Sequence, residues 1–328
     1  MCLKRFLLDR FLKAHECGMK TTAGSENTSG SVMDQVGGYI IHHISNSDIH
    51  HPIIQLPTIF GIDFSVTKHV FMLWVVAAIV GMVVIIPVRT YLKRKDDVPT
   101  GLENVVEAVV MFLRDSVVKP NVGSKWVDTW APIIFTYFFF ILTANAIGLI
   151  PIFDTIGVVG RLVLNVSPHD DHSLINSLLH GGATATGNFV VTSALASITF
   201  VCIMIAGTRA HGFLQYWKNL VPHGLPLLVY IILIPIEIIS MFVKPFALTM
   251  RLAANMMGGH IAILAILSFI PIFAEVFHSL GAGIGIAAFS VPIATGLTGL
   301  EIIVTLVQAY VFTLLSAVFI GMAINVHH

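Results

Sequence analysis

Long apolar segments, separated by shorter polar connections, set the pattern of this chain. Each is long enough to cross about 30 Å of hydrocarbon as a helix, which takes roughly 20 residues. The apolar segments cover approximately residues 69–91, 130–152, 188–207, 225–270 and 283–326. The pattern therefore predicts an all-α polytopic membrane protein with about five membrane-crossing segments.

The last two segments are much longer than one crossing requires. At 1.5 Å per residue, a continuous helix of about 45 residues extends roughly 65 Å. We therefore expect each of them to tilt steeply, to bend or to contain two helices in a hairpin. Pro235, Pro245 and Pro292 offer bend points, because a proline removes one backbone hydrogen bond and is still tolerated in membrane helices.

Composition supports a membrane protein and excludes several other classes. Apolar residues make up 56% of the chain and charged residues only 11%, against roughly 25% charged residues in soluble domains. The formal net charge is zero, so no nucleic-acid partner is expected. Cys2, Cys17 and Cys202 are too few for a disulfide framework, and no glycine-rich loop follows a strand. We expect no cofactor, no metal and no catalytic residue.

Basic residues predict the orientation. Residues 89–95, Arg209 and Lys218 fall on one side if the five segments alternate, and excess Lys and Arg marks the cytoplasmic side. The amino terminus and the connection 153–187 are then outside, and the carboxyl terminus is cytoplasmic. Residues 102–119 are too polar to cross alone and predict an amphipathic helix at the cytoplasmic interface.

The amino-terminal stretch differs from the rest. Residues 1–38 are basic at first and then rich in Gly, Ser and Thr, and they lack the apolar core of a secretory signal. We expect a disordered extension or an over-long start, with Met19 or Met33 as the true first residue. A mitochondrial transit peptide is the alternative. Residues 39–328 are expected to form one membrane domain.

Arg251 stands in the middle of the fourth apolar segment. A charge at bilayer depth costs from about 2.5 to more than 10 kcal/mol, so it persists only where it faces protein or water. Arginine cannot escape this cost by losing its proton. A fixed positive charge at this depth indicates an ion path.

Other polar residues of the last two segments fall into stripes when the segments are placed on helices that advance about 100° per residue. The stripe of the fourth segment comprises Glu237, Ser240, Lys244, Arg251 and Asn255. The stripe of the fifth segment comprises Glu301, Thr305, Gln308 and Phe312. His260 lies away from the first stripe. A single Asn or Gln in a membrane helix as often only forms a hydrogen bond to a neighbouring helix as it lines an ion route. Two stripes with Glu, Lys, Arg and Gln favour a hydrated ion route.

These residues carry a resemblance to subunit a of the F-type rotary ATP synthase. The matching runs are residues 143–151 (TANAIGLIP), 184–188 (TATGN), 234–237 (IPIE), 244–245 (KP), 251–260 (RLAANMMGGH) and 301–312 (EIIVTLVQAYVF). The resemblance implies a non-catalytic stator subunit in a bacterial plasma membrane, or in a mitochondrial inner membrane as the alternative. It also implies the c-ring, the subunit b peripheral stalk, the other Fo and catalytic-head subunits and membrane lipid as partners.

By the same resemblance, Arg251 faces the carboxylate of each passing ring subunit and separates two offset proton half-channels. The outer half-channel is expected to be lined by Asn255, His260, Glu301, Gln308 and Asn145, with Asn188 near its mouth. The inner one is expected to pass Glu237 and Ser240, with Lys244 near the cytoplasmic face. Family members often carry an acid where this chain has His260 and a histidine where it has Glu301. The exchange predicts that these two residues face one another.

Two other readings stay open. One is a self-contained secondary ion transporter built on broken helices, although no inverted repeat is visible in the hydropathy. The other is a structural membrane scaffold, which the polar stripes disfavour. Co-purification with a ring of small hairpin proteins would separate the ATP synthase subunit from both.

Overall fold

The computed structural model describes residues 65–93, 101–149, 185–218 and 226–325. Every regular element in these ranges is helical, which confirms the all-α prediction. The predicted extension 1–38, most of the connection 153–187 and Lys95 lie outside the described residues.

The first half of the described chain holds two membrane-length helices and one shorter helical arm. The elements are α3 (Lys68–Val80), a π-helical turn η1 (Gly81–Ile85), α4 (Ile86–Lys93), α5 (Leu102–Leu113), a second π-helical turn η2 (Arg114–Val118), α6 (Lys119–Val122) and α7 (Val127–Leu149). The first three follow one another without a break and together form the first span.

The second half is dominated by two very long helices. Its elements are the short 3-10 turn η3 (Ala185–Gly187), α10 (Phe189–His211), α11 (Phe213–Lys218), α12 (Leu227–Val276) and α13 (Leu280–Ile324). Gly212 ends α10 with a φ of 85°, a left-handed conformation that glycine adopts without steric cost.

Five helices are long and apolar enough to cross a membrane, as predicted. They cover His69–Lys93, Val127–Leu149, Phe189–His211, Val229–Val276 and Leu280–Ile324. The third helix ends four residues later than the apolar pattern predicted, and its last turn contains the polar residues Arg209 and His211. Hydropathy counts these residues against a span, whereas cations are favourable at a helix carboxyl end.

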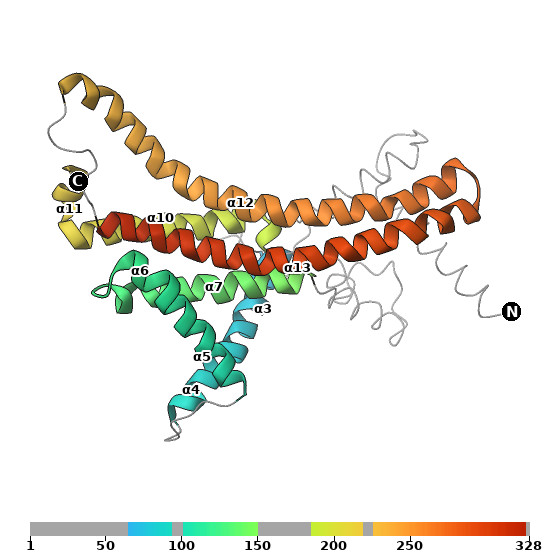
Figure 1. Cartoon of the computed structure of the whole chain (residues 1–328), viewed down its shortest axis with the longest axis horizontal. Helices are drawn as coiled ribbons and strands as arrows, with labels where there is room; N and C mark the ends of the chain where they lie inside the picture. Colours follow the sequence, from blue (N-terminus) through green and yellow to red (C-terminus); the bar gives the residue numbers. More distant parts are fainter. Residues whose placement is uncertain (1–64, 94–100, 150–184, 219–225, 326–328) are drawn as a thin grey trace.

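Each of the two long segments is one continuous helix, so neither contains two helices in a hairpin. α12 runs for 50 residues through Pro235, Pro245 and Pro271, and α13 runs for 45 residues through Pro292. α12 curves along its length (Figure 1). The curvature takes the amino-terminal part of α12 away from α13.

The bundle is assembled around α13. α12 and α13 form an antiparallel pair, and α7 and α10 pack against the carboxyl-terminal half of α13 (Figure 1). The outer part of the α12–α13 hairpin extends beyond them. The core lies where the four helices meet, and its fully buried side chains include Ile134, Ile141, Leu252, Met256, Phe312 and Ile320.

The helical arm α5 to α6 is amphipathic, as residues 102–119 predicted. Val106 and Leu113 are buried, whereas Glu107 and Arg114 are exposed. None of the span-length helices includes this arm. Its position at the membrane interface stays a prediction.

A close contact joins this arm to the end of α13. Gly321 lies so near the backbone carbonyl of Asn121 that a Cβ at position 321 would overlap it. One turn later, the Asn325 side chain donates to the same carbonyl at 3.3 Å. From α10, His211 Nε2 lies 2.8 Å from the carbonyl oxygen of Ile324. Two other elements, α6 and α10, therefore converge on the last turn of α13.

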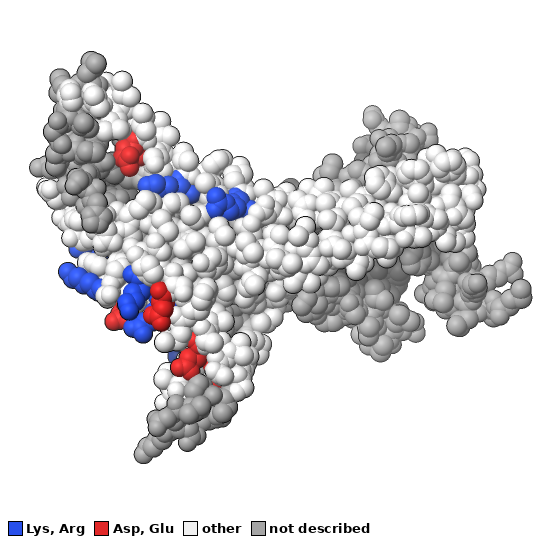
Figure 2. Space-filling view, viewed as in Figure 1, with Lys and Arg blue, Asp and Glu red and all other residues white. Residues whose placement is uncertain are grey.

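Charged side chains gather over one half of the described structure, on the arm formed by α4, α5 and α6 and along the amino-terminal half of α12 (Figure 2). In the same view, no charged side chain shows on the outer α12–α13 hairpin, whose exposed Glu275 does not lie on this face. The assignment of the charged half to the cytoplasmic side stays a prediction.

Candidate functional site

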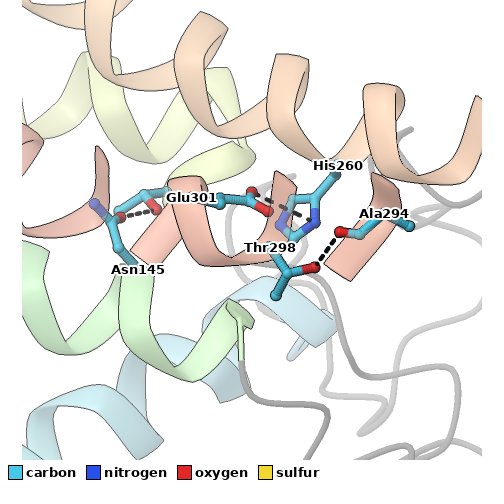
Figure 3. A network of polar contacts seen from close by, with 6 residues as sticks. Asn145, His260, Ala294, Thr298 and Glu301 are labelled. Carbon is cyan, nitrogen blue, oxygen red and sulfur yellow. Dashed lines mark hydrogen bonds and ion pairs between the residues drawn. The ribbon is translucent and has the colours of Figure 1, made fainter. Parts of the chain in front are cut away.

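The centre of the site is an acid and a base brought together by the two long helices. His260 projects from α12 and Glu301 from α13, and His260 Nδ1 lies 3.9 Å from Glu301 Oε1 (Figure 3). Glu301 is only 5% exposed, and His260 is half-buried. The structure thus places the two residues face to face, as the exchange of residue types predicts.

Gly259 makes room for this pair. A Cβ at position 259 would lie 2.6 Å from Glu301 Oε1, so the carboxyl group rests directly against the α12 backbone. Neither carboxyl oxygen of Glu301 has a hydrogen-bond partner among the described residues. A distance of 3.9 Å is too long for a direct hydrogen bond, and a bridging water can carry a proton across such a gap.

Asn145 joins the same region from α7. The Thr186 hydroxyl, in η3, donates a hydrogen bond to Asn145 Oδ1, and both residues are buried. Asn145 and Glu301 lie in the same region of the close view (Figure 3), and Asn145 Nδ2 has no hydrogen-bond partner in the described chain. Four separate elements therefore converge on one buried polar region.

Asn188 has a clear structural role. Its Oδ1 accepts a hydrogen bond of 2.8 Å from the Val190 backbone N–H and caps the start of α10. It also lines a mostly apolar cavity of about 400 Å³ between α3, α7 and α10, together with His69. The expected place at a channel mouth stays a prediction beside the capping role.

The fifth-segment stripe is buried along its whole length. Glu301, Thr305, Gln308 and Phe312 all face the bundle interior, as their helical spacing predicts. The hydroxyl of Thr305 has no hydrogen-bond partner within the described residues. Gln308 thus lies on the interior side of α13, one turn beyond Thr305.

The fourth-segment stripe lies on a different face. Arg251 and Asn255 are exposed, and a separation of nine residues puts Arg251 about 180° from His260 around α12. The structure does not bring Arg251 or Asn255 into the interior group of His260, Glu301 and Asn145. It places them on the outside of the bundle.

The remaining members of that stripe lie toward the amino-terminal end of α12. Glu237, Ser240 and Lys244 are half-buried, and Lys244 Nζ lies 5.9 Å from the ring centre of Phe319 on α13. A cation over an aromatic face is stabilised electrostatically. The stripe therefore continues along α12 from its charged end to Arg251.

Arg251 emerges from an apolar surface. Ile236, Val243 and Ile261 are exposed large hydrophobic residues of the same helix, and helical periodicity puts each within about 80° of Arg251. A surface of this kind marks a contact with lipid or with another protein, and lipid alone does not stabilise a guanidinium. The α12 face around Arg251 therefore has the properties of a protein interface.

Sequence reasoning did not identify every residue of the site. The Thr186 contact to Asn145 and the close approach at Gly259 both depend on distant elements meeting. The signals available were weak: Thr186 lies in a motif run, and Gly259 precedes His260 in a glycine pair.

Fold and site together define a class: a polytopic helical membrane protein with a buried acid–base pair inside and a fixed cation on one outer face. Sequence comparison specifies the family. The profile of the family described as ATP synthase A chain matches residues 70–321. This chain belongs to that family.

Individual members of this family are similar to the chain over most of its length. The chain is 39% identical over 305 residues to ATP synthase subunit a 2 of Chlorobium luteolum, covering 90% of this chain and 78% of the relative. It is 39% identical over 294 residues to ATP synthase subunit a of Chloroherpeton thalassium, covering 87% and 76%. It is 36% identical over 317 residues to ATP synthase subunit a of Anaeromyxobacter dehalogenans, covering 90% and 72%.

Proposed function

We propose that this chain is the proton-translocating stator subunit of a bacterial F-type ATP synthase and catalyses no step of ATP chemistry itself. The observation that carries the proposal is the two-sided character of α12. One side bears a fixed cation on an apolar surface, and the opposite side bears half of a buried acid–base pair. The bacterial relatives favour a plasma membrane over a mitochondrial one.

Arg251 would face the carboxylate of each passing c-ring subunit. At about 4 Å and an effective dielectric constant of about 20, two unit charges interact with about 4 kcal/mol. That energy is several times RT, so the cation favours the ionised carboxylate and drives release of its proton. Arg251 also repels a proton that would cross directly between the two half-channels.

The outer half-channel would use the interior polar group. Protons would pass by Asn188 and Asn145 to the pair His260–Glu301, and then toward Gln308 and Asn255. A histidine beside a carboxylate can accept and return a proton at physiological pH. The pair therefore supplies a relay at the depth where the ring carboxylate must be reprotonated.

The inner half-channel would take the released proton along the charged end of α12. Glu237, Ser240 and Lys244 lie in order along this path. The c-ring would cover the apolar face around Arg251, and subunit b, the other Fo subunits and the catalytic head would complete the assembly. Residues 39–328 would form the membrane domain, with the carboxyl terminus in the cytoplasm.

The test compares Arg251→Ala and Arg251→Lys in the assembled complex. Both should abolish ATP-driven acidification of inverted vesicles, because alanine has no charge and lysine lacks the planar, permanently charged group of arginine. Passive proton leak should rise in Arg251→Ala as the barrier between half-channels is lost. Normal coupled pumping by an assembled Arg251→Ala complex would refute the assignment, as would a purified complex that contains no ring of small hairpin subunits.

A further inference from the structure

A line of buried polar atoms without hydrogen-bond partners follows the contact between α7 and α13. Partners are missing, within the described residues, for Trp130 Nε1, Asn145 Nδ2, both carboxyl oxygens of Glu301, Thr305 Oγ1 and Ser316 Oγ. The Tyr137 hydroxyl instead interacts with Thr199 and Cys202 of α10. A buried polar group without a partner costs about 1–3 kcal/mol, so such groups ordinarily bind ordered water. Their positions mark where water can enter the bundle.

These atoms lie on two facing stripes. On α13, Glu301, Thr305 and Ser316 fall within about 60° of one another by helical count. On α7, Trp130 and Asn145 fall within about 60°. The two helices run in opposite directions, so that the amino-terminal end of α7, which carries Trp130, lies toward the carboxyl end of α13 (Figure 1). Asn145, near the other end of α7, lies in the same polar region as Glu301 (Figure 3).

The line therefore extends from the acid–base pair toward the charged half of the structure. Thr305 and Ser316 are separated by about 16 Å along α13. Trp130 lies in the first turn of α7, close to Asp128, whose side chain is 93% exposed. A continuous file of water along these stripes would join the outer polar region to the opposite surface.

One aromatic layer interrupts this file. Tyr137 and Phe312 pack edge to face with ring centres 5.5 Å apart. Phe312 and its neighbours Ile134 and Ile141 are almost completely buried. Between Thr305 and Ser316, the α13 stripe then presents Phe312 where a polar group would continue the line.

We propose that the Tyr137–Phe312 layer is a seal that stops protons from passing through the interior of this chain. Protons that crossed along α7 and α13 would never meet the ring carboxylate, and their free energy would be lost as leak. The inference rests on the proposed function. It adds a second barrier, inside the bundle, to the one that Arg251 provides at its surface.

The test measures passive proton conductance of reconstituted complexes whose ring carboxylates are replaced by the neutral amide, which removes conduction by rotation. Under a potassium diffusion potential, Phe312→Ala should conduct about tenfold more than the parent complex, which corresponds to about 1.4 kcal/mol off the barrier. Phe312→Leu, which keeps the layer apolar and filled, should stay near the parent. Equal conductance in Phe312→Ala and the parent would overturn the proposal.

Ile320→Ala is the matched control. Ile320 is fully buried on the same helix, but helical count puts it about 80° from Phe312 and off the polar stripe. Its truncation creates a cavity without joining the two polar regions, so its conductance should equal that of the parent. A leak as large as that of Phe312→Ala would assign the effect to general loosening and overturn the proposal.

A second measurement tests the seal even if Phe312→Ala does not assemble. In a background without native cysteines, Thr305→Cys should react with a small water-soluble thiol reagent only from the outer side, and Ser316→Cys only from the inner side. Reaction of either cysteine from both sides, or of neither, would overturn the seal. A different result would refute the proposed function itself: equal proton conduction by the parent complex with the amide ring and by the complex with the native acidic ring.

Discussion

Gly259→Ala tests the site through its tightest contact. The added Cβ would lie 2.6 Å from Glu301 Oε1 and 2.9 Å from Glu301 Cδ, whereas ordinary contacts of this kind are roughly 3.5 Å or longer. The carboxyl group is the flexible partner, so it must move by about 1 Å. Because Gly259 precedes His260 on the same turn of α12, the displacement acts directly on the acid–base pair.

The magnitude follows from the pair's geometry. His260 Nδ1 and Glu301 Oε1 are 3.9 Å apart, and widening that gap by 1 Å at a dielectric constant of about 20 loses about 0.9 kcal/mol of attraction when both groups are charged. That loss alone is roughly fourfold in rate. Misplacement of a reacting group by 1 Å can cost about a hundredfold. We expect proton flux to fall by between about fourfold and a hundredfold.

The assay is ATP-driven acidification of inverted vesicles, normalised to the amount of assembled complex. Gly285→Ala is the control, because a Cβ at this exposed α13 position meets no atom within 4 Å. An alanine in place of a helical glycine otherwise stabilises by about 0.5–1 kcal/mol. Unchanged flux in Gly259→Ala, with the complex intact, would refute the role assigned to the Glu301 position.

Three further predictions concern other contacts. His260→Ala and Glu301→Ala should each cut proton flux severely, and the double exchange His260→Glu with Glu301→His should recover part of it in the same vesicle assay. Gly321→Ala should lower the thermal stability of the solubilised protein by about 1–3 kcal/mol, because a rigid backbone carbonyl of Asn121 occupies the space; a melting temperature equal to that of the parent would contradict this. Burial raises the pKa of Tyr216, so the contribution of this residue to stability should be constant below about pH 10 and fall above it. Tyr216→Phe should show a smaller alkaline decrease than the parent in a melting series across pH.

The spans could be predicted from sequence because membrane-length hydrophobicity is a strong local signal. Their ends were less predictable, since residues such as Arg209 and His211 are helical through backbone hydrogen bonds that hydropathy does not count. Whether α12 and α13 bend or divide could not be decided either. Proline permits both outcomes, and packing against neighbouring helices determines which occurs.

Within the site, too, helical faces could be predicted from the sequence, whereas contacts between helices could not. Helical spacing correctly put Glu301, Thr305, Gln308 and Phe312 on one buried face. The hydrogen bond between Thr186 and Asn145 joins residues 41 positions apart, and no local pattern contains such a contact. The approach of Glu301 to Gly259 likewise depends on how closely two helices pack.

Arg251 shows why helical spacing alone cannot separate a channel from an interface. The count that grouped Glu237, Lys244, Arg251 and Asn255 describes only a shared direction, and polar residues avoid lipid equally well inside a bundle or beneath a partner. In the folded chain, His260 takes the side of α12 that faces α13, and Arg251 takes the opposite side. A charge there remains costly until another protein covers it. The exposed apolar surface around Arg251 is therefore best explained as a surface completed by a partner subunit.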